Sequence, residues 1–341
     1  MRLYKLPLLV LVTALIAPAL LTAQQAPAWK PARLPDGHPD FQGTWVNNTA
    51  TPFFRPASLA DKATLSDAEI AVLKKRAARL FDGAGDPAIG DELFETLLKD
   101  PDKFVSSRPT GDYNSVWLDE PLVFEHRTSQ IVDPPTGRLP PLTPEGQQKQ
   151  AARAAHLRDH GADGPEDRLP RERCIVMGAI KVGFLQSRTI SYFQIVQTAS
   201  MLVLQSEANH DSRFIALDRK QHLPASIRRW LGDSLGRWDG DTLVIETTNF
   251  HPQSILRVGN VEAYSAEHFS VVERLTQLEP DAMQYEVTVT DPTTWTRPWT
   301  AMTTWQRSNA RMFEDACHEG NYGLEGILRG ARAQEKERPG K

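Results

Sequence analysis

The segment GRWDGDTLVIETTNF, residues 236–250, has the pattern of a β-hairpin. Asp239-Gly240 is the dipeptide favoured in two-residue hairpin turns, because both central positions need a positive φ. After the turn, residues 242–248 alternate between two faces with the period of two that a β-strand has. The sequence therefore predicts two adjacent antiparallel strands around this turn.

The second strand of the hairpin ends in Asn249, Phe250 and His251 instead of an ordinary polar turn. At about 3.3 Å per residue, the strand over residues 241–249 would span roughly 25 to 30 Å, enough to cross a small barrel. We therefore expect these three residues at the opposite rim, where they could bind a ligand. The alternative is that Asn249, which tolerates left-handed backbone angles, only ends the strand.

Further short runs of β-branched and aromatic residues follow one another from about residue 173 onward, separated by Gly, Pro, Asp and Asn. This pattern is typical of an antiparallel barrel or sandwich. Residues 65–81, 91–98 and 144–160 instead have helical patterns. We therefore predict a mainly β protein with inserted helices (α+β), built on an antiparallel β-barrel or a strongly bent sheet.

The N-terminus has the features of a secretory signal peptide. Arg2 and Lys5 precede a mostly apolar run, and a plausible cleavage site follows Ala23 or, alternatively, Ala26. An uncleaved membrane anchor is the other interpretation, but no strong stop-transfer flank follows. No other stretch is long and apolar enough to span a bilayer.

The domain prediction follows from these segments. Residues 1–23 are the signal peptide and residues 24–39 a Pro-rich linker. One β-barrel-like domain occupies residues 40–335, with a helical insertion at about 55–165 and a C-terminal helix at 324–335.

Cys174 and Cys317 are the two cysteines of the chain. In an exported protein an even count favours a disulfide, and two cysteines permit one intramolecular pairing. A buried thiol plus a reactive one is the alternative. These features predict a periplasmic or secreted protein.

Composition excludes several classes of function. The formal net charge is −4 and no basic patch stands out, which argues against nucleic-acid binding. Dinucleotide, P-loop and Gly-x-Ser-x-Gly motifs are absent, so no cofactor is predicted. His156 and His160 lie one helical turn apart without an obvious third ligand, and no metal is predicted.

Gly43-Thr44-Trp45 on the first predicted strand resembles the Gly-x-Trp signature of lipocalins and related calycin barrels. This resemblance implies that Trp45 closes the floor of a lipocalin-like barrel and that an arginine from a late strand packs on it. Arg297, within WTRPW, is the candidate for that arginine. The insertion of roughly 110 residues after the first strand departs from a compact lipocalin.

A second resemblance covers most of residues 120–335. The segments GRWDGDTLVIETTNF, DPTTWTRPWT and ACHEGNYGLEGIL are similar to those of a family of exported bacterial proteins. This resemblance implies export and assigns no catalytic residue.

Four ionisable residues near predicted strand ends are the candidate catalytic set: His210, Asp211, His268 and Glu273. Histidine is suited to proton transfer near neutral pH, and a neighbouring carboxylate raises its basicity. Arg213 is a candidate ligand-binding residue, although Asp211 and Arg213 would also make an ordinary cross-strand ion pair.

Two functions fit this pattern. The first is an exported, cofactor-independent enzyme that performs acid–base chemistry, as a lyase, hydratase, isomerase or hydrolase, on a small apolar molecule in a β-barrel cup. The second is a lipocalin-like carrier that only binds its ligand. Convergence of His210, His268 and Glu273 in one cavity favours the enzyme, whereas scattered exposed positions favour the carrier. A structural protein of the cell envelope is a third interpretation; the substrate and the oligomeric state are left open.

Overall fold

The computed structural model describes residues 29–81, 91–99, 123–178, 191–258, 261–263 and 267–337. The chain divides into two compact units, Met1–Lys30 and Pro31–Lys341. The predicted signal peptide, residues 1–23, lies outside the described residues.

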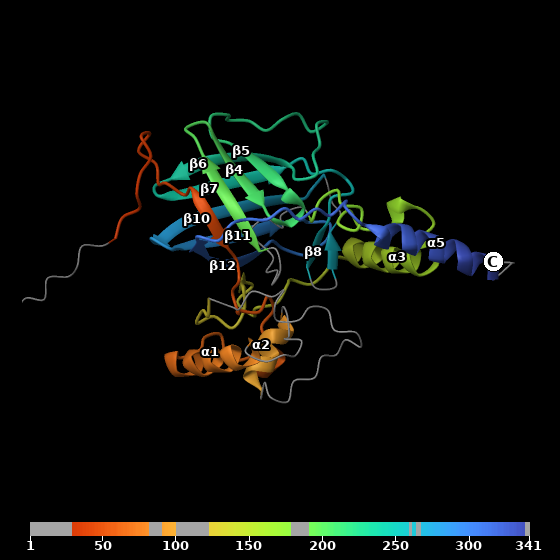
Figure 1. Cartoon of the computed structure of the whole chain (residues 1–341), viewed down its shortest axis with the longest axis horizontal. Helices are drawn as coiled ribbons and strands as arrows, with labels where there is room; N and C mark the ends of the chain where they lie inside the picture. The colour runs from red at the N-terminus through yellow and green to blue at the C-terminus, as the bar shows by residue number, and fades with distance from the viewer. Residues whose placement is uncertain are drawn as a thin grey trace, which may run out of the picture. The chain divides into compact units, whose positions relative to one another are not determined.

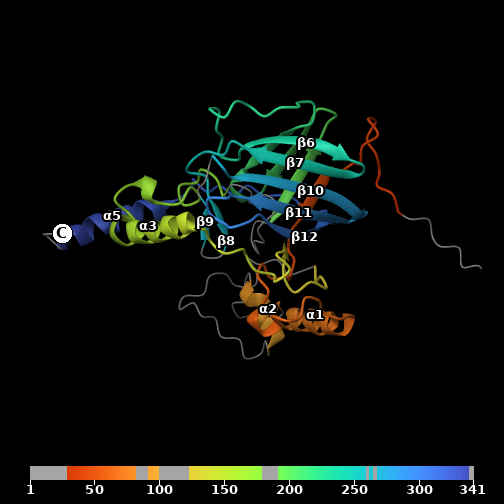
Figure 2. The same ribbon diagram turned by 180° about the vertical axis from the view of Figure 1, so that it is seen from behind.

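A closed β-barrel is the centre of the second unit. Among the described residues, ten strands form one sheet, and pairing of β12 with β1 closes nine of them into a ring. Figures 1 and 2 show β6, β7, β10, β11 and β12 side by side from opposite directions. In pairing order the ring consists of β1 (Gly43–Val46), β3 (Tyr192–Gln197), β4 (Met201–Ser206), β5 (Ser212–Ala216), β6 (Asp233–Asp239), β7 (Thr242–Thr248), β10 (Ser270–Glu279), β11 (Ala282–Thr290) and β12 (Trp299–Ser308).

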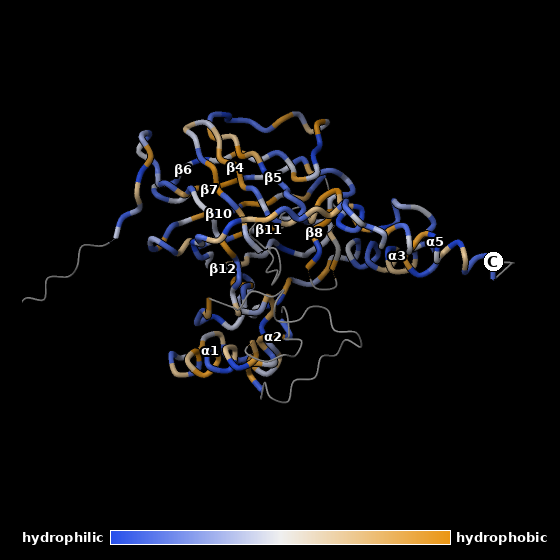
Figure 3. Tube along the Cα trace, viewed as in Figure 1, coloured by the Kyte–Doolittle hydropathy of each residue, from blue (hydrophilic) through white to orange (hydrophobic). Residues whose placement is uncertain are grey.

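The hairpin predicted over residues 236–250 is present as β6 and β7. Asp239 pairs with Thr242, so the two turn residues are Gly240 and Asp241 and not Asp239 and Gly240. Gly240 has φ 61°, as the first central position of a two-residue turn with glycine there requires. Apolar residues recur along the barrel strands (Figure 3) because alternate side chains point into the barrel. The mainly β barrel fold with inserted helices is confirmed.

One junction of the ring differs from the antiparallel prediction. β5 and β6 run parallel and share two residue pairs, Ile215 with Ser234 and Ala216 with Leu235. Parallel neighbours need a connection that carries the chain back to its starting end, and residues 217–232 make this connection. The barrel is therefore mixed.

Two short strand pairs lie outside the ring among the described residues. β2 (Ile131–Asp133) pairs with the first residues of β12, and β8 (Leu256–Val258) pairs with β9 (Val261–Ala263) in a separate sheet.

The first two helices form their own small apolar core. α1 (Asp67–Phe81) begins with a capping box, in which Ser66 N donates to Glu69 Oε2 (2.9 Å) and Glu69 N donates to Ser66 Oγ (3.4 Å). Buried residues of α1 pack with those of α2 (Asp91–Leu98).

Two further helices are mostly polar. Thr143 caps α3 (Pro144–His160) by accepting a hydrogen bond from Gly146 N at 2.9 Å. α5 (Tyr322–Glu337) begins two residues before the predicted C-terminal helix. Short 3₁₀ helices are η1 (Ala57–Leu59), η4 (Pro165–Asp167) and η5 (Ala208–His210). Among the described residues, no helix is long and apolar enough to span a bilayer.

Trp45 is fully buried, but a different arginine from the predicted one packs on it. The Arg307 guanidinium lies 4.4 Å from the centre of the Trp45 ring, because the register of β1 and β12 places the two residues opposite each other. Arg297 lies in the turn before β12, where it is exposed and pairs with Asp133. The prediction for Arg297 is therefore wrong, and Arg307 takes that place.

Gly43 allows this approach of Arg307. Its φ is 127°, and a Cβ atom at this position would lie 2.5 Å from Arg307 Nη1. The backbone angle requires glycine, and a side chain at this position would also displace the Arg307 guanidinium from Trp45, which explains the glycine of the Gly-x-Trp motif.

The predicted disulfide between Cys174 and Cys317 is present. It joins the segment after η4 to the segment between β12 and α5, residues that are 143 positions apart in the sequence.

Candidate functional site

A buried ion pair lies inside the barrel. Arg213 on β5 is 2% exposed and Glu273 on β10 is 0% exposed. Their contact is bidentate, with Nη1 donating to Oε1 at 2.9 Å and Nη2 donating to Oε2 at 2.6 Å. Both residues occupy inward positions of their strands: Glu273 lies between buried Val271 and Leu275, and Arg213 lies two residues before buried Ile215.

Three hydroxyl groups from other strands complete this site. Tyr285 on β11 donates to Glu273 Oε1 at 2.6 Å. Arg213 Nη2 lies 3.4 Å from Ser234 Oγ on β6 and 3.2 Å from Thr247 Oγ1 on β7. We call these five residues, all buried, the Arg213 cluster.

The charges of the Arg213 cluster stabilise each other. Burial alone would lower the pKa of Arg213, but the adjacent Glu273 carboxylate and its hydrogen bonds raise this pKa above its ordinary value. Burial, together with the negative charge of Glu273, raises the pKa of Tyr285 well above its ordinary value. Tyr285 therefore stays neutral and acts as a hydrogen-bond donor.

Aromatic rings surround one side of the cluster. Trp305 on β12 stacks on Tyr285 with 4.6 Å between the ring centres, and Phe193 on β3 contacts Trp305 edge-on at 4.3 Å. All three rings are buried in the apolar core of the barrel. The polar groups of the site are thus enclosed by apolar and aromatic surface.

Two buried donors in this core lack an acceptor among the described residues. Arg213 Nε is one, although the rest of its guanidinium is well bonded. The other is Trp295 Nε1, in the turn before β12. Because buried N–H groups are nearly always hydrogen-bonded, these atoms indicate places where another molecule could supply an acceptor.

The four predicted catalytic residues do not converge. Glu273 lies inside the barrel, but His210, in η5, and His268, before β10, are exposed. Asp211 is buried, where it accepts hydrogen bonds from Met177 N (2.9 Å) and Asn209 Nδ2 (3.0 Å). Arg213 pairs with Glu273 and not with Asp211, so the cross-strand pair considered for these two residues is wrong.

The connection between β4 and β5 instead holds the two disulfide-linked segments. Asp211 accepts from Met177, close to Cys174, and Asn209 N donates to Asp315 Oδ2 at 2.8 Å, close to Cys317. Asn209 and His210 have positive φ angles of 53° and 42°, which brings these groups into a tight turn. The groups of this turn therefore have a structural role, which is to hold the two disulfide-linked segments.

The end of the opening hairpin secures the connection between β5 and β6. Asn249, with φ 55°, donates from Nδ2 to the Leu223 oxygen at 2.8 Å. Phe250 is 1% exposed in the apolar core, and the His251 ring stacks on Trp230 with 4.1 Å between centres. These contacts end the strand and fasten residues 217–232.

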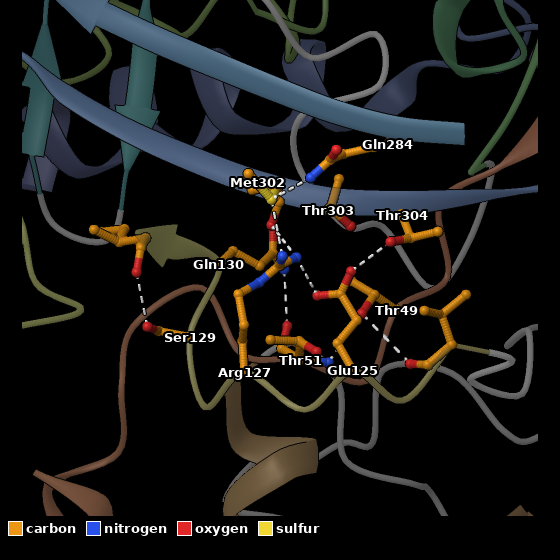
Figure 4. Close-up of polar contacts among 12 residues, drawn as sticks. Thr49, Thr51, Glu125, Arg127, Ser129, Gln130, Gln284, Met302, Thr303 and Thr304 are labelled. Carbon is orange, nitrogen blue, oxygen red and sulfur yellow. Dashed lines mark hydrogen bonds and ion pairs between the residues drawn. The ribbon is translucent and has the colours of Figure 1, made fainter. Parts of the chain in front are cut away.

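A second polar cluster lies between residues 123–131 and β12 (Figure 4). Arg127 donates to Glu125, to the Met302 oxygen and to the Met302 sulfur, which also accepts from Gln284. Thr304 donates to Glu125 Oε1 at 2.7 Å. These contacts attach the segment to the barrel, although Arg127 Nε, like Arg213 Nε, is buried without a hydrogen-bond partner among the described residues.

Sequence reasoning identified Arg213 and Glu273 individually but missed their partnership with Ser234, Thr247 and Tyr285. The alternation along β10 gave a usable signal, because Glu273 shares a face with Val271 and Leu275. A charged residue on an otherwise apolar face predicts either a buried partner or a site.

Within the part of the chain that the structure describes, no group of three or more His, Cys, Asp or Glu residues is arranged to hold a metal ion. Comparison of the chain with protein-family models, with curated proteins and with solved structures gave no match.

Proposed function

We propose that this protein binds a small, largely apolar molecule in its β-barrel and carries it without chemical change. The observation that supports this function best is the Arg213 cluster, a charged and hydroxyl-rich site enclosed by apolar and aromatic side chains of a closed barrel. Apolar walls with a few polar groups that orient the ligand are typical of small-molecule binding sites.

A carrier accounts for the cluster better than an acid–base enzyme does. A general base needs an accessible lone pair next to the proton that it removes. Both oxygens of Glu273 are instead held by Arg213, and one of them also by Tyr285. The histidines predicted to assist are exposed elsewhere.

Other features support a lipocalin-like carrier that acts outside the cytoplasm. The Trp45–Arg307 contact is of the kind that the calycin resemblance implies. The Cys174–Cys317 disulfide is typical of proteins in oxidising compartments, and the N-terminal pattern favours export to the periplasm or beyond.

The test is ligand capture by the mature, disulfide-bonded protein. Native mass spectrometry of protein purified from the periplasm, followed by extraction and identification of bound molecules, should find a small apolar compound in stoichiometric amount. The double variant Arg213→Met with Glu273→Gln should lose it.

A matched control uses the ion pair on the outer surface of the same barrel. Arg237 and Glu246 lie 4.0 Å apart on β6 and β7, with side chains 61% and 51% exposed. Arg237→Met with Glu246→Gln should retain the ligand. Equal retention by both double variants, or wild-type protein that captures nothing from extracts and binds no apolar probe, would contradict the proposed function.

A further inference from the structure

In the Arg213 cluster the acceptor oxygens of Glu273, Ser234 and Thr247 have hydrogen-bond donors, but one donor has no acceptor among the described residues. Each carboxylate oxygen of Glu273 accepts from Arg213, and so do the hydroxyl oxygens of Ser234 and Thr247. The unpartnered group is a donor, Arg213 Nε, and Trp295 Nε1 is a second donor without an acceptor in the same apolar core. A molecule that complements Arg213 must supply an acceptor.

The charge of the cluster restricts the acceptor further. Arg213 and Glu273 form a 1:1 pair with side chains 1% and 0% exposed, so their charges balance inside the barrel. A ligand carboxylate would add an uncompensated negative charge to this buried site, and burial of an unpaired charge is strongly unfavourable. A carbonyl, ester or ether oxygen would accept from Nε without changing the balance.

We infer that the ligand is an uncharged, apolar molecule with a carbonyl-type oxygen that accepts a hydrogen bond from Arg213 Nε. This inference rests on the proposed carrier function and adds the ligand's chemical class. The stacked pair of Tyr285 and Trp305 next to the cluster favours a ligand with a flat, aromatic or conjugated part.

Three probes of nearly equal size separate the effect of a neutral acceptor oxygen from the effect of a negative charge. 2-Acetonaphthone has a neutral carbonyl, 2-ethylnaphthalene has no acceptor, and 2-naphthoate has a carboxylate. Binding to wild-type protein is measured by quenching of tryptophan fluorescence and by calorimetry. We expect acetonaphthone to bind roughly five- to tenfold more tightly than ethylnaphthalene, the effect of one buried hydrogen bond, and naphthoate to bind most weakly.

The same probes test Arg213 directly. In Arg213→Met with Glu273→Gln, acetonaphthone should lose its advantage over ethylnaphthalene, while the Arg237→Met with Glu246→Gln control keeps it. A second measurement uses wild-type protein, so it does not depend on whether a variant folds. In NMR spectra of arginine-labelled protein, the Nε–H resonance of Arg213 should shift when acetonaphthone is added and should not shift with ethylnaphthalene.

The outcomes distinguish this inference from the proposed function. Equal binding of the two neutral probes, tightest binding of naphthoate, or an Nε–H signal that ignores acetonaphthone would overturn the ligand class but leave a carrier. If none of the probes binds and no compound co-purifies, the carrier function itself fails, and the inference fails with it.

Discussion

Stability alone does not explain why Arg213 and Glu273 lie inside the barrel. Replacing a buried ion pair by apolar residues of similar volume is often neutral or stabilising, because both charges lose their hydration on burial. Here the pair has good geometry and three hydroxyl partners, yet Arg213 Nε is still without an acceptor among the described residues. The proposed recognition of a ligand would account for a buried polar site that stability does not require.

The energetic consequence of this pair can be measured. Removing one partner, by Arg213→Met or Glu273→Gln, leaves an uncompensated polar group in the apolar core. Each single variant should lower the free energy of unfolding by about 3 to 5 kcal/mol. The double variant should be destabilised by less than the sum of the two single changes. Urea unfolding of all four proteins gives this comparison, and additive losses would show that the two charges do not act as a pair.

The arginine on Trp45 makes a second prediction about single residues. Arg307→Met removes the cation–π contact and the bonds to the Gln42 and Pro280 oxygens, so it should lower the unfolding free energy by about 1 to 2 kcal/mol. Arg297→Met, which removes an exposed pair with Asp133, should change it by about 0.5 kcal/mol or less. Thermal melts compare the two variants. A larger loss of stability in Arg297→Met than in Arg307→Met would contradict the assignment of Arg307 as the arginine that packs on Trp45.

At the scale of elements, local patterns in the sequence predicted most of what the structure contains. The hairpin of β6 and β7, the capping box of α1 and the bounds of α2 and α3 all depend on neighbours within a few residues. The parallel junction of β5 and β6 could not be predicted this way, because it depends on where residues 217–232 return the chain. The Arg213 cluster depends on the register of five strands, so it could not be predicted from local patterns either.

The connection between β5 and β6 is anchored by a buried carboxylate, which gives it a pH dependence. Asp233 accepts from Arg219 (2.7 Å), His222 Nδ1 (3.0 Å) and Leu223 N (3.0 Å). Burial alone would raise the pKa of Asp233, but these partners together lower it below its ordinary value. The folded state therefore favours the ionised form.

The sign of the effect follows from this lowered pKa. The contribution of Asp233 to stability is fully present above its unfolded pKa of about 3.9 and is lost as the pH falls through the lower folded value. Asp233→Asn should be less stable than wild type at pH 7, and the gap should narrow below pH of about 4. Urea unfolding across this range checks the prediction, and a gap that widens in acid would refute it.

At the scale of the whole molecule, the disulfide joins two segments that do not belong to a common helix or sheet. Cys174 precedes the barrel strands β3 to β12 and Cys317 follows them, so the closed loop contains most of the ring. The cysteine count and the predicted export were enough to predict this bond, because two cysteines allow one intramolecular pairing. No count of residues in the sequence identifies the Arg213 cluster in the same way.

Removal of the disulfide should therefore affect the fold more than the ligand site. With the two cysteines 143 positions apart in the sequence, the chain-entropy model gives a loss of about 4 to 5 kcal/mol for Cys174→Ala with Cys317→Ala. No hydrogen bond joins a residue of the Arg213 cluster to either cysteine in the described structure, so the folded variant should keep the preference of wild type for a neutral carbonyl probe over its carboxylate analogue. Urea unfolding gives the stability, and probe titration below the unfolding transition gives the preference. A lost preference in folded protein would mean that the segments held by the disulfide help to shape the site.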